Sequence, residues 1–251
     1  MLTTEKSLKS RFRAIFTSIL LTSPPNFADR LKSLLKGVTS NSLEYLGSTN
    51  EIDLTIIAIA IGAYWHQDLQ EVRSRILGLQ PHCNADIQEL VLAYAIALAC
   101  RNELKPQLFI NQICDDFNKR RSLSRDPESQ KNCLNQLQLA QDFIDQGASA
   151  ITAHRTNGLS DAIASSLYYF LSTTHSWQIV TDRANINNLQ IAIQSGAITA
   201  AYLGEIGNIS KQNQELLNKG LILGDRLWAE WAGVFDAKLD TQSREIDICH
   251  S

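Results

Sequence analysis

The chain has 251 residues, of which 44% are hydrophobic, and this is enough apolar material for one substantial core. Its 23 Lys and Arg residues against 26 Asp and Glu residues give a net charge of -3, so the sequence offers no large basic field for nucleic acid or for an anionic membrane. Only 12 Gly and 5 Pro residues are present, fewer than all-β sandwiches and barrels usually use in their turns. The composition therefore predicts a globular, mainly helical protein.

The first half of the chain shows the spacing of helices. Residues 7–21 carry apolar side chains every three or four positions, and Pro24 ends this predicted helix. Residues 52–65 are apolar at nearly every position, which predicts a helix buried on all sides at the centre of the core. A second helix is predicted at 28–35, ended by Gly37, and a short turn or helix follows at 40–46. Further helices are predicted at 68–79 and at 106–117. Between these two, a long helix begins at a cap, either Asn84 or Asp86, and runs through Cys100.

A polar stretch at residues 118–131 separates the two halves of the chain. It contains Pro127 and is almost wholly hydrophilic, so we predict a loop there. A linker between two domains is the alternative. Because both halves have the same helical pattern, we favour a loop within a single helical domain spanning residues 1–251.

The second half predicts further helices at 133–146, 161–171, 176–184 and 213–235, with Ser160 and Ser176 as caps of the second and third. Between the last two, a turn at 185–188 precedes a helix that ends at Gly204. Small residues recur every four positions on this helix, at Gly196, Ala200 and Gly204. Such a ridge allows another backbone to approach closely.

Two features bear on where the protein resides. Basic residues precede an apolar run near the N-terminus, as in a secretory signal, but Thr17 and Ser18 interrupt the run and no cleavage site follows. No pair of cysteines has C-x-x-C spacing, so we expect reduced core thiols. The cysteines are Cys83, Cys100, Cys114, Cys133 and Cys249. We therefore expect a cytoplasmic protein that does not bind membranes.

Three segments carry motifs that point to a family. Residues 160–172 read SDAIASSLYYFLS and are followed by GAITAAYLG at 196–204. Residues 52–55 read IDLT, and residues 10–13 read SRFR. Together these segments resemble the ADP-ribosylglycohydrolase family, in a shortened form of cyanobacterial type. They are similar to its Gly-Ala-Leu-x-Gly-Ala-x-x-Gly helix end, its Thr-Asp-Asp-Thr segment and its first helix. The resemblance implies an all-α fold, a single orthogonal multi-helix bundle.

The same resemblance implies that catalysis is lost. Active members of the family hold two magnesium ions between the acids of the Thr-Asp-Asp-Thr segment and those of a late Asp-x-Asp-Thr segment. Here Asp53 and Thr55 match, but Leu54 replaces an acid. The late positions fall on Asn187 and Leu189, with Gln190 in place of the threonine. Because magnesium requires oxygen ligands and compensating negative charge, we expect no metal and no cofactor.

The expected function is therefore that of a degenerate ADP-ribosylglycohydrolase-like protein, a pseudoenzyme that binds or scaffolds. Vestigial pocket positions for an ADP-ribose-like or nucleotide ligand would be Asp53, Thr55, Asn187, Asn188 and Gln190. Two alternatives remain open. One is a hydrolase of ADP-ribosyl N- or O-glycosidic bonds with Asp53, the best single catalytic candidate, as its sole base. The other is a structural subunit whose small-residue ridge or C-terminal helix meets a protein partner.

Overall fold

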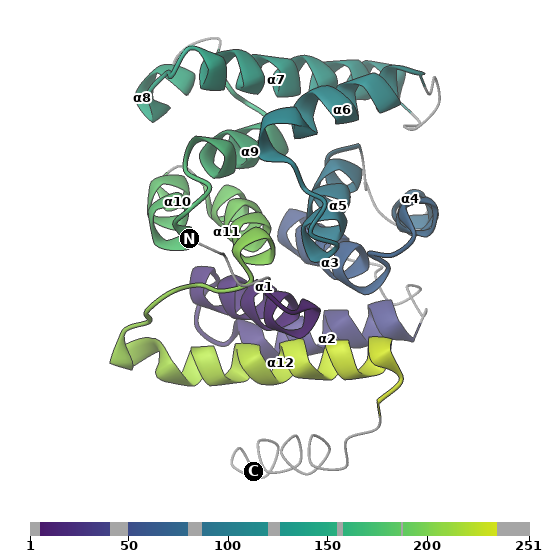
Figure 1. Ribbon diagram of the computed structural model, residues 1–251, viewed down its shortest axis with the longest axis vertical. Helices are drawn as coiled ribbons and strands as arrows, with labels where there is room; N and C mark the ends of the chain where they lie inside the picture. Colours follow the sequence, from purple (N-terminus) through teal and green to yellow (C-terminus); the bar gives the residue numbers. More distant parts are fainter. Residues whose placement is uncertain are drawn as a thin grey trace.

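The computed structural model describes residues 6–40, 50–79, 87–119, 126–154, 158–186 and 188–234. All regular secondary structure in these residues is helical, which confirms the predicted all-α class (Figure 1). The helices are α1 (Leu8–Thr22), α2 (Phe27–Thr39), α3 (Glu51–Tyr64), α4 (Leu69–Leu79), α5 (Ile87–Cys100), α6 (Pro106–Lys119), α7 (Pro127–Asp145), α8 (Ala150–Ala153), α9 (Ala162–Ser172), α10 (Trp177–Asn185), α11 (Leu189–Leu203), the short 3-10 helix η2 (Lys211–Asn213) and α12 (Gln214–Ala232).

Several helix ends differ from the predictions. Helix α2 continues through Gly37 to Thr39, because the apolar face extends to the buried Val38. Helix α7 begins at Pro127, where Asp126 provides the cap and proline occupies a first-turn position that needs no N–H. The polar stretch at 118–131 is therefore helical at both its ends, and residues 120–125 lie outside the described part.

Some of the predicted helix caps are confirmed and one is replaced by its neighbour. Asp161, and not Ser160, caps α9, since its carboxylate accepts hydrogen bonds from the N–H groups of Ile163 and Ala164. Ser176 caps α10 as predicted, and Gly204 ends α11 in the left-handed conformation. The predicted turn or helix at 40–46 falls mostly on undescribed residues, and the candidate caps Asn84 and Asp86 both lie outside the described part.

The core lies where α3, α5 and α11 meet in the middle of the molecule (Figure 1). From Asp53 to Ala63, every residue of α3 is buried, which confirms the helix predicted to be buried on all sides. Gly62 lets α3 approach α5 closely, because a side chain there would meet the carbonyl oxygen of Ala93. One cluster of buried hydrophobic residues extends from Phe12 on α1 to Leu227 on α12.

Helix α1 is held between α11 and α12. On the α11 side, Gly196 faces the Ser18 hydroxyl and Ala200 is fully buried. The small-residue ridge thus packs against helices of the same chain and is not a surface for a partner. On the α12 side, Gly220 faces the backbone of Thr17, and Gly224 lies so close to α1 that an added Cβ would sit 2.6 Å from the Cα of Arg13. This second pair of small residues did not stand out in the sequence.

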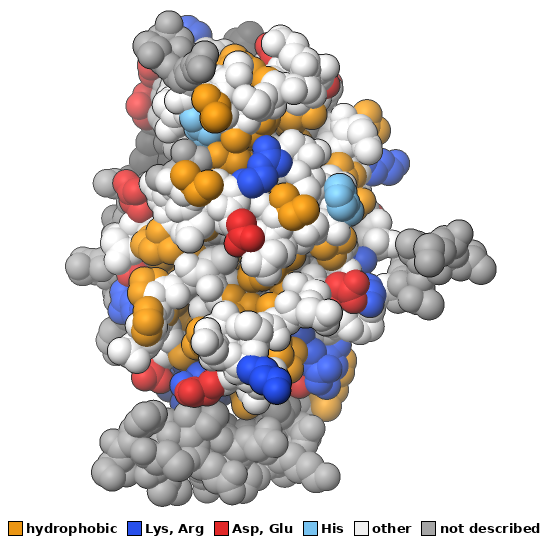
Figure 2. Space-filling view, turned by 90° about the vertical axis from the view of Figure 1, so that its left-hand side faces the viewer, with side chains coloured by type: hydrophobic (Ala, Val, Ile, Leu, Met, Phe, Trp, Pro, Cys, Tyr) orange, Lys and Arg blue, Asp and Glu red, His pale blue; other side chains and the backbone are white. Residues whose placement is uncertain are grey.

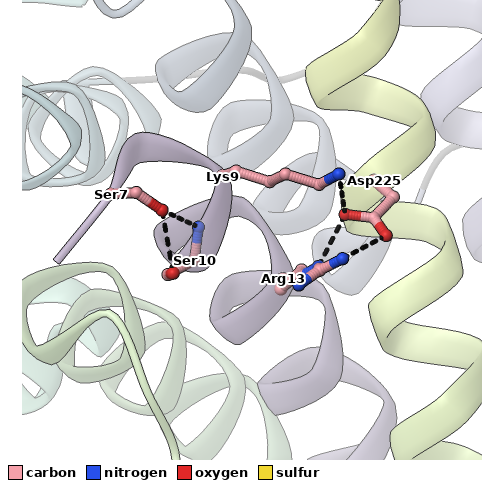
Figure 3. Close-up of polar contacts among 5 residues, drawn as sticks. All are labelled: Ser7, Lys9, Ser10, Arg13 and Asp225. Atoms are coloured by element: carbon pink, nitrogen blue, oxygen red, sulfur yellow. Dashed lines mark hydrogen bonds and ion pairs between the residues drawn. The ribbon is translucent and has the colours of Figure 1, made fainter.

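Basic residues of α1 fasten it to its neighbours. Asp225 of α12 accepts hydrogen bonds from Arg13 Nε at 2.6 Å and Nη2 at 2.7 Å, and Lys9 Nζ lies 3.5 Å from the same carboxylate (Figure 3). Ser7 caps the start of α1 by accepting the N–H of Ser10 (Figure 3). Arg11 is buried and donates to the carbonyls of Ala201 and Tyr202 at the end of α11. The residues that resemble a signal segment therefore have structural contacts.

The surface in Figure 2 carries charged side chains of both signs, interspersed with hydrophobic ones. On this face, cationic side chains do not form a continuous patch of the kind that holds a phosphate backbone. None of the described helices is long and apolar enough to cross a membrane.

Two packed histidines make stability depend on pH. His66 lies between the rings of Phe12 and Trp231, at 6.2 Å and 5.0 Å, and donates from Nδ1 to the Ala63 carbonyl. His154 stacks on Tyr169 at 5.5 Å. Burial lowers the pKa of both histidines. The unfolded chain therefore binds protons more readily than the folded one. The histidines contribute their whole share to the free energy of unfolding above about pH 6.5, and this share is lost as the pH drops toward their lowered pKa values in the folded protein.

Urea unfolding at pH 7.5, 6.5 and 5.5 measures this dependence. We expect the free energy of unfolding to decrease on acidification and the decrease to be smaller in His66→Phe, which keeps a ring between Phe12 and Trp231 but cannot titrate. A decrease of equal size in the variant and in the unaltered protein would contradict a contribution from His66.

Candidate functional site

Asp53 lies in the first turn of α3 and its side chain faces α2. The residue is 1% exposed, and its backbone N–H donates to the side chain of Asn50, the cap of the helix. Both carboxylate oxygens are engaged by Arg30 of α2, with Nε at 3.1 Å and Nη2 at 2.6 Å. This bond raises the pKa of Arg30. The charge of the best catalytic candidate is thus compensated by a two-point ion pair.

Thr55 faces a different neighbour. Successive residues are rotated by about 100° around a helix axis, so Thr55 points to nearly the opposite side of α3 from Asp53 and faces α11 while Asp53 faces α2. Its hydroxyl oxygen accepts from Gln190 Nε2 at 3.2 Å and from Gln194 Nε2 at 3.3 Å. Gln194 Oε1 in turn accepts from the hydroxyl of Ser166 on α9 at 2.9 Å. These four side chains form a buried polar network joining α3, α9 and α11.

Asn188 caps α11, and its Oδ1 accepts the backbone N–H of Gln190 at 2.7 Å. This bond uses one of the N–H groups that a helix start can offer to a phosphate. Asn187 lies outside the described residues. Of the predicted pocket positions, the structure thus brings together Thr55, Gln190 and Asn188, whereas Asp53 makes its side-chain bonds with Arg30.

The sequence reasoning missed three residues of this region. Gln194 stands one turn after Gln190 on a helix whose residues are mostly apolar, and a second glutamine on a buried face is a signal of a buried hydrogen bond. Ser166 lies on the equally apolar α9 and carries the same signal. Arg30 carries none, because its pairing with Asp53 depends on how α2 packs against α3.

The residues present do not fit the two magnesium ions of active family members. The Asp53 carboxylate already faces a guanidinium cation, and the amide N–H groups of Gln190 and Gln194 point at the Thr55 oxygen. Two divalent cations there would be poorly compensated in charge. No group of three or more His, Cys, Asp or Glu side chains in the described ranges is arranged to hold a metal ion.

The candidate site is closed, and open cavities lie elsewhere. Thr55 is fully buried, and Gln190 is 9% exposed. A cavity of about 520 Å³ lies between the end of α1, the start of α2 and one side of α12. A smaller one of about 290 Å³ lies beside it, against α10. Neither is lined by Asp53, Thr55, Asn188 or Gln190.

Comparison of the chain with protein-family models, with curated proteins and with solved structures found no match. The resemblance to ADP-ribosylglycohydrolases therefore remains a prediction from the motifs quoted above. The helical class is confirmed by the structure, and the particular type of bundle belongs to the proposal that follows.

Proposed function

We propose that this chain is a non-catalytic protein of ADP-ribosylglycohydrolase type that works by binding or scaffolding. The observation that carries the proposal is the ion pair of Arg30 with Asp53. A general base must reach the proton that it removes, directly or through one water. At 1% exposure and with both oxygens bound, Asp53 is placed to anchor Arg30 rather than to activate water.

Arg30 gives the binding function a specific chemistry. A guanidinium has five N–H donors, of which the contacts with Asp53 use two, and 48% of the Arg30 side chain is exposed. A phosphate of an ADP-ribose-like or nucleotide ligand is the kind of group that such a planar, partly free donor set binds. Asp53 would then fix the guanidinium without contacting the ligand.

Calorimetric titration of ADP-ribose, first with magnesium and then with a chelator, tests this proposal. We expect the same affinity in both conditions, and a loss of at least tenfold in Arg30→Gln because the phosphate contact is removed. Lys105→Gln, at an exposed position before α6, serves as the control and should bind as the unaltered protein does. An absence of heat at millimolar ligand in both conditions would exclude ADP-ribose and direct the search to protein partners.

The alternative is a hydrolase that uses Asp53 as sole base, and the retained Asp53-x-Thr55 spacing favours it. It would require Arg30 to leave the carboxylate. We expect no release of ADP-ribose from an ADP-ribosylated peptide, with or without magnesium, and no difference between the unaltered protein and Asp53→Asn. Turnover that disappears in Asp53→Asn would overturn the non-catalytic proposal.

We place this function in the cytoplasm. Cys100, Cys114 and Cys133 are buried and are not in disulfides. Burial raises the pKa of Cys100 to about 12 and that of Cys114 to about 11, so neither carries a reactive thiolate near neutral pH. Reduced, unreactive core cysteines support a reducing compartment.

A further inference from the structure

Helix α10 has apolar residues on both of its faces. Its inner face packs against α9 and α11 and includes the buried residues Trp177, Val180 and Ala184. Its outer face carries Ile179, which is 47% exposed, and Ile186, which is 85% exposed. Ile186 follows the last residue of the helix but keeps a helical backbone, so the two isoleucines, seven residues apart, lie on one line along α10. A helix that is apolar on two faces is usually covered on both.

Opposite charges flank this apolar line. Asp182 and Arg183 stand midway between the two isoleucines, and the turn of about 100° per residue puts them on opposite sides of the line. Arg183 lies on the side of α9, where its Nη1 donates to Thr173 at 2.8 Å and to Ser172 at 3.2 Å. Asp182 lies on the other side and lines the cavity of about 290 Å³ at the end of α1. Figure 2 looks onto the side of the molecule that α10 occupies in Figure 1, and hydrophobic side chains lie there beside charges of both signs.

A second copy of the chain fits this arrangement when the two α10 helices run in the same direction. A two-fold axis between the helices and parallel to them sets each isoleucine against its own counterpart. The same axis sets Asp182 of each copy beside Arg183 of the other, since a two-fold contact is reciprocal. In an antiparallel pair, by contrast, each charge would lie beside its own counterpart and be repelled. The outer face of α10 is therefore complementary to itself in the parallel orientation.

We propose that the chain forms a weak symmetric dimer through the outer faces of two parallel α10 helices. Burial of Ile179 and Ile186 supplies the apolar contact at the centre, and the two ion pairs of Asp182 with Arg183 at the rim fix the orientation. Because α10 has only 9 residues, the contact is smaller than the roughly 1,600 Å² of standard interfaces, so we expect a dissociation constant on the order of 100 µM. This surface contains no residue of the candidate functional site, so the inference does not depend on the function proposed above.

Analytical ultracentrifugation of the full chain at concentrations between about 5 and 500 µM tests the proposal. We expect the average mass to rise with concentration from that of one chain toward that of two. Growth beyond two chains would contradict the proposal, because a two-fold contact closes on itself. A protein that stays monomeric over the whole range would overturn it and leave this face to a different protein.

Three variants locate the contact. Ile186→Asn shortens the apolar line at an exposed position, and we expect it to weaken association by about tenfold or more while the fold, judged by circular dichroism, is unchanged. Ile151→Asn is the matched control, because Ile151 is also an exposed isoleucine, at 71%, but lies on α8, so association should not change. Asp182→Asn distinguishes the two orientations, since it should weaken a parallel pair by about threefold and strengthen an antiparallel one. Unchanged association in Ile186→Asn, an equal loss in Ile151→Asn, or stronger association in Asp182→Asn would each contradict the proposal.

Discussion

Replacing Gly220 by valine is expected to lower the free energy of unfolding by about 3 kcal/mol or more, at the upper end of the range for overpacked interiors. A Cβ at this position would meet the backbone of Thr17, so α1 and α12 would have to separate. Backbone atoms cannot turn aside as a flexible side chain can. Chemical denaturation followed by circular dichroism measures the difference.

Gly37→Ala is the matched control. Gly37 is also helical, but nothing lies within 4 Å of an added Cβ. The substitution should therefore stabilise the protein by about 0.5–1 kcal/mol, through the lower conformational entropy of the unfolded chain. If the free energy of unfolding of Gly220→Val lies within about 0.5 kcal/mol of that of the unaltered protein, the result would contradict the close approach of α1 and α12.

The second large effect is an asymmetry between Arg30 and Asp53. Arg30→Gln leaves a buried carboxylate without its cation and should destabilise by about 2–3 kcal/mol. This is less than for a fully buried pair, because the Arg30 side chain is 48% exposed and water can enter the vacated space. Asp53→Asn leaves Arg30 to be solvated and should cost less than about 1 kcal/mol.

A double-mutant cycle isolates this interaction. The variant carrying both Arg30→Gln and Asp53→Asn should be more stable than Arg30→Gln alone, because the uncompensated charge is gone. Equal losses in the two single variants, or additive losses in the double variant, would show that Asp53 does not rely on Arg30. The same variants separate stability from binding, since the affinity for ADP-ribose should fall more in Arg30→Gln, which loses the phosphate contact, than in Asp53→Asn, which loses only the group that positions Arg30.

The fold was largely predictable because helix periodicity and caps are local signals. The continuous apolar run at 52–65 correctly predicted a helix with no exposed face, and Asn188 and Gly204 marked the ends of α11. Local signals failed where packing overrode them. Gly37 did not end α2, since Val38 continues its buried face, and Asp161 replaced Ser160 as the cap of α9.

The candidate site was predictable only in part. The motif spacing selected Asp53 and Thr55, but spacing along the chain does not say which neighbour a side chain meets. The pairing of Asp53 with Arg30, and of Thr55 with Gln190 and Gln194, follows from the positions of α2 and α11 around α3. The order of the helices in the sequence does not contain that information. The cavity beside α12 has the same origin, because three separate segments form it.

The position of α1 between α11 and α12 has a consequence for biosynthesis. The first described helix finds two of its main partners only near the other end of the chain, with α12 as its most extensive contact. At about 5–20 residues per second, a ribosome needs roughly 10–40 seconds to make the intervening segment. During that time the apolar face of α1, with Phe12, Phe16 and Ile19, has no native cover from these helices. The nascent chain is therefore expected to be a client of chaperones that recognise exposed hydrophobic segments until α12 has been translated.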